Sequence, residues 1–122
     1  MKFARTAHTA LTVRRVNKGK IRIGDQTITE NVLLFRNEVR RGFNLSKATD
    51  PNGRMIRNLI TEQPEIIILG SGWQSVMPPR ELVFTLARKG IGFECMDTPA
   101  ACRTFNILLS ENRDVAAILL VT

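Results

Sequence analysis

The stretch EIIILGSG at residues 65–72 decides the fold of this 122-residue chain. Its run from Ile66 to Leu69 is apolar, unbroken and mostly β-branched, which is typical of a strand covered on both faces. Gly70-Ser71-Gly72 ends that strand, and two glycines this close together favour a tight turn. We therefore expect a buried strand at the centre of an α/β sheet.

Helices and further strands are predicted to alternate around that strand. The helices are expected to begin at Asp50-Pro51, Pro78-Pro79 and Thr98-Pro99, with Asp50 and Thr98 as N-caps and Gly90 as a left-handed C-terminal cap. Their apolar faces are predicted to be Met55, Ile56, Leu59 and Ile60; Leu82, Val83, Leu86 and Ala87; and Ala101, Phe105, Leu108 and Leu109. Further strands are expected at residues 91–95 and 115–122. Strands separated by helices need crossover connections, so residues 50–122 are predicted to form a β-α-β-α-β unit.

The first half of the chain has the period-two alternation that is typical of β-strands. Residues 9–36 alternate between apolar and polar side chains and break at Gly or Asn, which predicts a small antiparallel meander that extends or covers the sheet. Residues 37–49 are polar and irregular, and we expect a mobile connection there. No linker or repeat divides the sequence, so residues 1–122 are predicted to form a single α/β domain.

Composition sets limits on location. The longest apolar run, residues 115–121, has seven residues, whereas a membrane span needs roughly 20. The two cysteines lack a C-x-x-C spacing, so free thiols in a reducing compartment are expected. The first 24 residues hold seven Lys or Arg and no acid, a transit-peptide trait, but their alternating pattern favours folded strand. We assign the protein to the cytoplasm.

The positive charge is unevenly distributed. The net charge is +7. Residues 1–62 hold 13 basic against 5 acidic side chains, and residues 63–122 hold 5 against 6. A basic half attracts nucleic acid, anionic lipid or an acidic protein partner, although such charges are often only a solvated face. Nucleic acid is disfavoured because aromatic residues do not alternate with the charges as they do in single-strand binders.

Two groups of residues are candidates for ligand binding. The turn Gly70-Ser71-Gly72 follows a buried strand, where α/β sheets bind ligands and where backbone amides can cradle an anion. On the third helix, Arg103, Asn106 and Ser110 form a polar stripe in which Arg103 could hold an anion. The alternatives are a simple tight turn and a solvated helix face.

The sequence identifies no complete catalytic apparatus: a Ser-His-Asp arrangement is disfavoured, whereas carboxylate or lysine chemistry stays open. The turn is neither a dinucleotide-binding G-x-G-x-x-G, a P-loop nor a nucleophile elbow. The only histidine, His8, precedes the first strand and is expected to be exposed, while Cys102 is expected to be a buried, inert thiol. We therefore assign no catalytic residue, metal or cofactor.

The second half of the chain resembles a known family. The resemblance covers residues 64–121 and is carried by EIIILGSG and by TPAACRTFN at residues 98–106. It points to the small family of domains of unknown function that includes the mitochondrial NADH dehydrogenase (complex I) assembly factor 3 and the adipogenesis-associated protein of animals. The chain departs from the family's pattern at Phe105, where Tyr is common, and in residues 37–49, which lack a frequent Trp.

This resemblance implies a fold, a site and a role. The implied fold is a three-layer α/β domain with a central mixed sheet of about five strands. The implied binding site is a cleft whose residues would be Gly70, Ser71, Gly72, Thr98, Arg103 and Asn106. The family brings no established enzymatic activity, and its mitochondrial member assembles a respiratory complex.

Three functions are therefore open. The favoured one is a non-enzymatic interaction or assembly factor whose partner has an acidic surface. The second is a protein or enzyme that binds a small anion through the glycine turn and Arg103. The third is nucleic-acid binding by the basic half.

Overall fold

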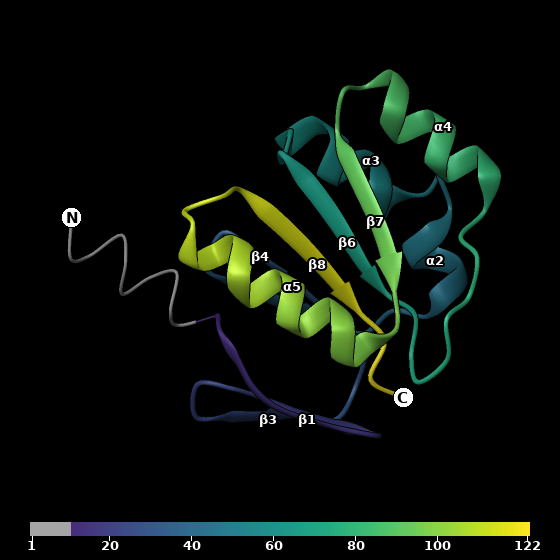
Figure 1. Cartoon of the computed structure of the whole chain (residues 1–122). Helices are drawn as coiled ribbons and strands as arrows, with labels where there is room; N and C mark the ends of the chain where they lie inside the picture. Colours follow the sequence, from purple (N-terminus) through teal and green to yellow (C-terminus); the bar gives the residue numbers. More distant parts are fainter. Residues whose placement is uncertain (1–10) are drawn as a thin grey trace.

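The structure is a computed structural model that describes residues 11–122 (Figure 1). It contains a three-stranded antiparallel sheet and a five-stranded mixed sheet. The small sheet consists of β1 (Val13–Asn17), β2 (Lys20–Ile23) and β3 (Gln26–Ile28). The large sheet has the order β5-β4-β8-β6-β7 and consists of β4 (Val32–Phe35), β5 (Glu38–Arg41), β6 (Ile66–Gly70), β7 (Gly92–Met96) and β8 (Val115–Leu119).

The predicted β-α-β-α-β unit is confirmed. Strand β6 pairs in parallel with both β7 and β8, and the connections run through α4 (Arg80–Arg88) and α5 (Thr98–Ser110). Strands β4 and β5 extend the sheet in the antiparallel direction. The central mixed sheet that the resemblance implied is therefore present.

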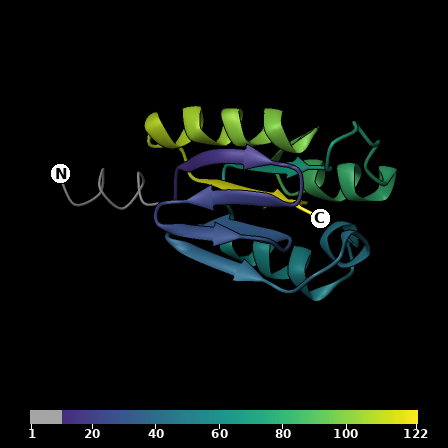
Figure 2. The ribbon, with the colours of Figure 1, turned by 90° about the horizontal axis from the view of Figure 1, so that it is seen from below.

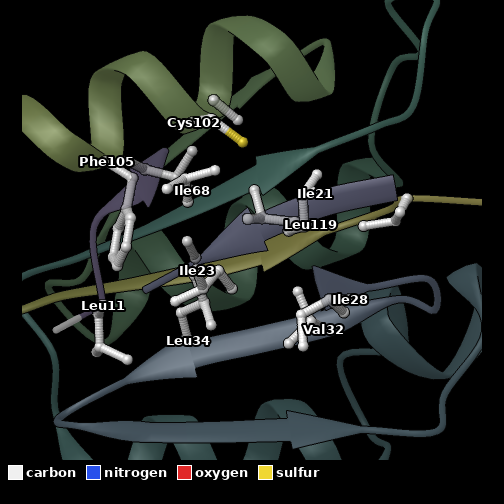
Figure 3. Packing of buried hydrophobic residues seen from close by; sticks show 14 of the residues in the cluster. Leu11, Ile21, Ile23, Ile28, Val32, Leu34, Ile68, Cys102, Phe105 and Leu119 are labelled. Atoms are coloured by element: carbon white, nitrogen blue, oxygen red, sulfur yellow. The ribbon is translucent and has the colours of Figure 1, made fainter. Parts of the chain in front are cut away.

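Both faces of the large sheet are covered, which gives three layers (Figure 2). Because side chains alternate along a strand, Ile67 and Leu69 pack on one face, against α3 (Arg54–Glu62), α4 and the short α2 (Leu45–Thr49). Ile68 packs on the other face, against α5 and the small sheet. Figure 3 shows Ile21 of the small sheet beside Leu119, Ile23 beside Leu34, and Ile28 beside Val32.

The N-terminal prediction needs correction. The meander was expected over residues 9–36, but β4 leaves the small sheet and joins the large one; residues 9 and 10 lie outside the described part. Residues 37–49, expected to be an irregular connection, form β5 and α2. Arg36 and Asn37 have φ angles of 47° and 67°, the double left-handed turn that suits a tight hairpin.

Helix boundaries also differ from the expected ones. Helix α3 begins at Arg54 rather than at Asp50, because Asp50 and Gly53 close a turn through a backbone hydrogen bond of 3.0 Å. Asp97, not Thr98, caps α5. The C-terminal cap at Gly90 is confirmed by its φ of 72°. Val83 and Ala87, expected to face inward, are exposed. Strand β7 runs from Gly92 to Met96 rather than over residues 91–95, and β8 ends at Leu119 instead of Thr122.

Candidate functional site at the glycine turn

The glycine turn and the start of α5 meet at one point, as the sequence predicted. Gly70 lies opposite Met96 at the ends of β6 and β7, and the Ser71 amide donates to the Met96 carbonyl at 2.8 Å. The Thr98 amide donates to the Gly72 carbonyl at 2.7 Å. Parallel strands that end together therefore deliver both elements to the same edge of the sheet.

Thr98 holds this corner together. Its side chain is completely buried. The hydroxyl donates to the Leu120 carbonyl at 2.7 Å and accepts from the Gly72 amide at 2.9 Å. The hydroxyl thus both donates and accepts a hydrogen bond inside the protein. Thr98 therefore connects the glycine turn to the segment after β8.

Gly70 allows the close approach of α5. A Cβ at this position would lie 3.0 Å from the Ala101 Cβ and 3.1 Å from the Thr98 Cα. The helix therefore crosses the strand so closely that a side chain at position 70 would require its neighbours to shift by a few tenths of an ångström.

The polar backbone groups at the corner are largely satisfied internally. The amides of Ser71 and Gly72 donate within the protein, as described above. At the start of α5, Ala100 donates to the Asp97 carboxylate at 2.8 Å and Pro99 has no N–H. The Ser71 hydroxyl donates to the Gln74 carbonyl at 2.9 Å. Consequently these amides do not form the anion cradle that the turn suggested.

Within residues 11–122, neither Arg103 nor Asn106 forms a hydrogen bond with the glycine turn. Arg103 is exposed on α5. Asn106 is half-buried and faces β1, where its amide group accepts from the Val13 N–H and donates to the Val13 carbonyl, each at 2.9 Å. Asn106 therefore fastens the small sheet to α5.

A hollow of about 380 Å³ does lie against the turn. Ser71 and Gly72 line it together with six residues outside the predicted set of site residues: Lys18, Trp73, Gln74, Val76, Val121 and Thr122. Lys18 reaches this place because Gly19 donates to the Val121 carbonyl at 3.0 Å, which holds the β1–β2 turn against the exit of β8. The sequence signal was the turn at Asn17-Lys18-Gly19, but its position depends on a contact with the other end of the chain.

The two thiols are free and pack on opposite faces of the large sheet. Burial raises the pKa of Cys102 to about 12 and also raises the pKa of the half-buried Cys95. Cys102 is thus protonated at neutral pH, and the predicted buried thiol is confirmed. His8 lies outside the described residues.

A second hollow lies where α2, α3 and β5 meet, on the face of the large sheet that does not carry the small sheet. Its volume is about 460 Å³. We call it the basic groove and define it by seven of its lining residues: Arg40, Arg41, Phe43, Lys47, Asp50, Arg54 and Met55.

The cations of the basic groove are unequally neutralised. Arg40 bonds Glu38 at 2.8 Å and Glu62 at 3.4 Å, and these bonds raise its pKa. Arg41 lies 3.7 Å from Glu30. Within residues 11–122, neither of the other two cations, Lys47 and Arg54, lies within 4.0 Å of a carboxylate.

Two further properties of residues 11–122 bear on function. No helix in this range is long and apolar enough to cross a membrane. No three His, Cys, Asp or Glu side chains of this range come together as a metal site.

Comparisons with known proteins agree with this architecture. The structure of an outer membrane protein from Bartonella henselae superimposes with a TM-score of 0.77 and 29% identity, over 91% of this chain and 94% of that one. The "13 kDa major membrane protein" of Francisella tularensis is 36% identical over 62 residues, or 51% of this chain and 50% of that protein.

A further relative matches a stretch of the same length. NADH dehydrogenase [ubiquinone] 1 alpha subcomplex assembly factor 3 of Danio rerio is 42% identical over 62 residues, or 51% of this chain and 36% of that protein. The chain thus matches half or less of the length of these two relatives. Residues 13–120 match the family described as "Protein of unknown function (DUF498/DUF598)". The resemblance found in the sequence is confirmed, and this chain belongs to the DUF498/DUF598 family, together with the complex I assembly factor 3 proteins.

Proposed function

We propose that this protein is a non-catalytic interaction factor that holds an acidic segment of a partner protein in the basic groove. One observation carries the proposal: the groove combines apolar side chains with four cations against one lining carboxylate, Asp50, and two of these cations have no described carboxylate within 4.0 Å. Phe43 and Met55 are half-buried and offer apolar contact, while Lys47 and Arg54 lie exposed beside them. A segment with acidic and apolar residues would satisfy both features.

The relatives support an interaction role without defining its partner. One of them is named an assembly factor of NADH dehydrogenase, so we extend an assembly role to this chain as part of the proposal. The protonated Cys102 thiol is unsuited to nucleophilic catalysis, which favours a role without chemistry. The free cysteines favour a reducing compartment, and we propose the cytoplasm.

The test is a capture experiment at physiological salt with a charge-reversed groove. We expect Lys47→Glu/Arg54→Glu to lower partner retention by at least about tenfold, since like charges across an interface cost several kcal/mol. Arg80→Glu/Lys89→Glu, two exposed cations on and just after α4, is the matched control and should retain the partner. Equal retention by both variants, or no retained protein at all, would contradict the proposal.

A photo-crosslinker identifies the bound segment. With Phe43→p-benzoylphenylalanine, we expect the crosslinked peptide of the partner to contain Asp or Glu beside apolar residues. A crosslinked segment rich in Lys or Arg would reject the acidic partner.

A second candidate is a small anion in the hollow at the glycine turn. The observation that favours it is the presence of Lys18 beside Gly72 in that hollow. Inorganic phosphate should then raise the melting temperature. Loss of this shift in Lys18→Ala places the anion at the turn, whereas loss in Arg103→Ala places it on α5 as the sequence suggested. An unchanged shift in both variants rejects both sites.

A further inference from the structure

The exposed face of the small sheet is unusually rich in arginine, and a β-bulge is the cause. The register between β1 and β2 shifts between Val13 and Arg15. Without the shift, strict alternation would turn Arg15 inward. The extra residue instead leaves both Arg14 and Arg15 exposed and returns Val16 to the packed face.

The bulge also places like charges side by side. Arg15 lies directly opposite Arg22 of β2, and Arg22 in turn lies opposite Thr27 of β3. Like charges that face each other across two strands destabilise a sheet. Such a pair is therefore a stability cost that a bound anion would remove.

We call the four exposed cations of β1 and β2 the basic sheet face: Arg14, Arg15, Lys20 and Arg22. Within residues 11–122, the single carboxylate within 4.0 Å of any of them is Asp25, which lies 3.9 Å from Arg22 with its side chain fully exposed. Residues 1–24 contain no Asp or Glu. An ion pair this exposed contributes little, so the face keeps most of its positive charge.

Arg14, Arg15 and Arg22 surround a hollow of about 430 Å³, with Gly24 and Asp25 completing its lining. Guanidinium groups bind phosphate oxygens in pairs, which makes arginine the preferred residue for phosphate recognition. Asp25 opposes an anion at this place, but its exposed side chain is free to turn away from Arg22.

We infer that the basic sheet face docks the protein on the phosphate headgroups of an anionic lipid bilayer. Four cations spread over two strands suit an array of phosphates better than one small anion. The strands have three to five residues, so the face extends about 17 Å at most and is open to solvent. Clustered Lys and Arg on such a face are attracted to anionic lipid.

A nucleic acid is the less favoured occupant. Strands β1 to β3 carry no aromatic side chain on which a base could stack. The inner face of the small sheet is fixed by the core and by Asn106, which makes it a rigid platform. The basic groove lies on the other face of the large sheet, so docking on a membrane leaves that groove free.

The test measures co-sedimentation with vesicles of phosphatidylcholine alone or with about one third phosphatidylglycerol. We expect binding to the anionic vesicles only, weakened by added salt. In Arg14→Gln/Arg15→Gln/Arg22→Gln the affinity should fall about a hundredfold, roughly fivefold for each cation lost. The control Arg57→Gln/Arg80→Gln/Lys89→Gln removes three exposed cations elsewhere and should lower it by less than about threefold.

Other outcomes separate the alternatives. Because the triple variant removes a repulsive pair, its melting temperature should equal or exceed that of the unmodified protein, which keeps misfolding from explaining lost binding. Equal vesicle binding by the triple variant and the control overturns the inference. So does tighter binding to a short DNA duplex than to the vesicles, or release from the vesicles by millimolar inorganic phosphate at constant ionic strength.

Discussion

Replacing Thr98 by valine should destabilise the protein by about 3 kcal/mol. The change keeps the shape of the side chain but removes a hydroxyl that bonds two backbone groups, the Leu120 carbonyl and the Gly72 amide. Leaving a buried polar group without a partner costs about 1–3 kcal/mol. Leu120 is 8% exposed and should incur most of that cost, whereas the half-buried Gly72 can recruit water.

The assay is urea unfolding followed by circular dichroism, with Thr98→Ser as the matched control. Serine keeps both hydrogen bonds and loses one buried methyl group, which costs about 1 kcal/mol. The valine variant should therefore be about 2 kcal/mol less stable than the serine variant, because the lost hydroxyl costs more than the lost methyl group. If valine proves as stable as serine at this position, the hydroxyl does not tie the corner and our account of the glycine turn is wrong.

Three further predictions concern the same region. Gly70→Ala should cost about 2 kcal/mol in thermal or urea unfolding, since its Cβ would overpack against the Thr98 Cα; a neutral effect would show that α5 can move. Asn106→Ala should cost about 1–2 kcal/mol and speed hydrogen exchange of the Val13 amide; unchanged exchange there would exclude the proposed fastening role. The Cys102 pKa of about 12 lies above its ordinary value of 9.0, so the stability that comes with the protonated thiol is complete below pH 9.0 and is lost as the pH rises toward 12. Cys102→Ala should flatten this decline, and an equally steep decline in that variant would assign it to other groups.

Local patterns predicted the elements whose signals lie within the element itself. The run Ile66 to Leu69 predicted a strand buried on both faces, and it forms β6, an interior strand of the large sheet. The Asp97-Thr98-Pro99 sequence predicted the start of α5, although the N-cap is Asp97 and not Thr98. The sequence could not settle which residue is the N-cap, because Asp and Thr both cap helices and only the backbone angles show where the helix begins.

Elements and contacts that depend on distant residues could not be predicted. The five-residue α2 has no apolar periodicity to read, and it is stabilised by the Asn44 cap and by burial of Ala48. The partner of Asn106 lies 93 positions away in the sequence, so its place in a polar stripe was read as a ligand site. The bulge in β1, by contrast, left a signal: Val13 and Val16 stand three positions apart, a spacing that strict alternation cannot place on one face of a strand.

The glycine turn illustrates why polar residues at a strand end need not bind a ligand. At the corner, the hydroxyl of Thr98 and the amides of Ser71 and Gly72 are all engaged in joining the ends of β6, β7 and β8. Hydrogen-bond capacity used for structure is not available for recognition. Recognition must then come from groups that the fold leaves unsatisfied, and among the described residues the clearest are the cations of the basic groove and of the basic sheet face. Because these lie on opposite faces of the large sheet, one protein could hold a partner and a membrane at the same time.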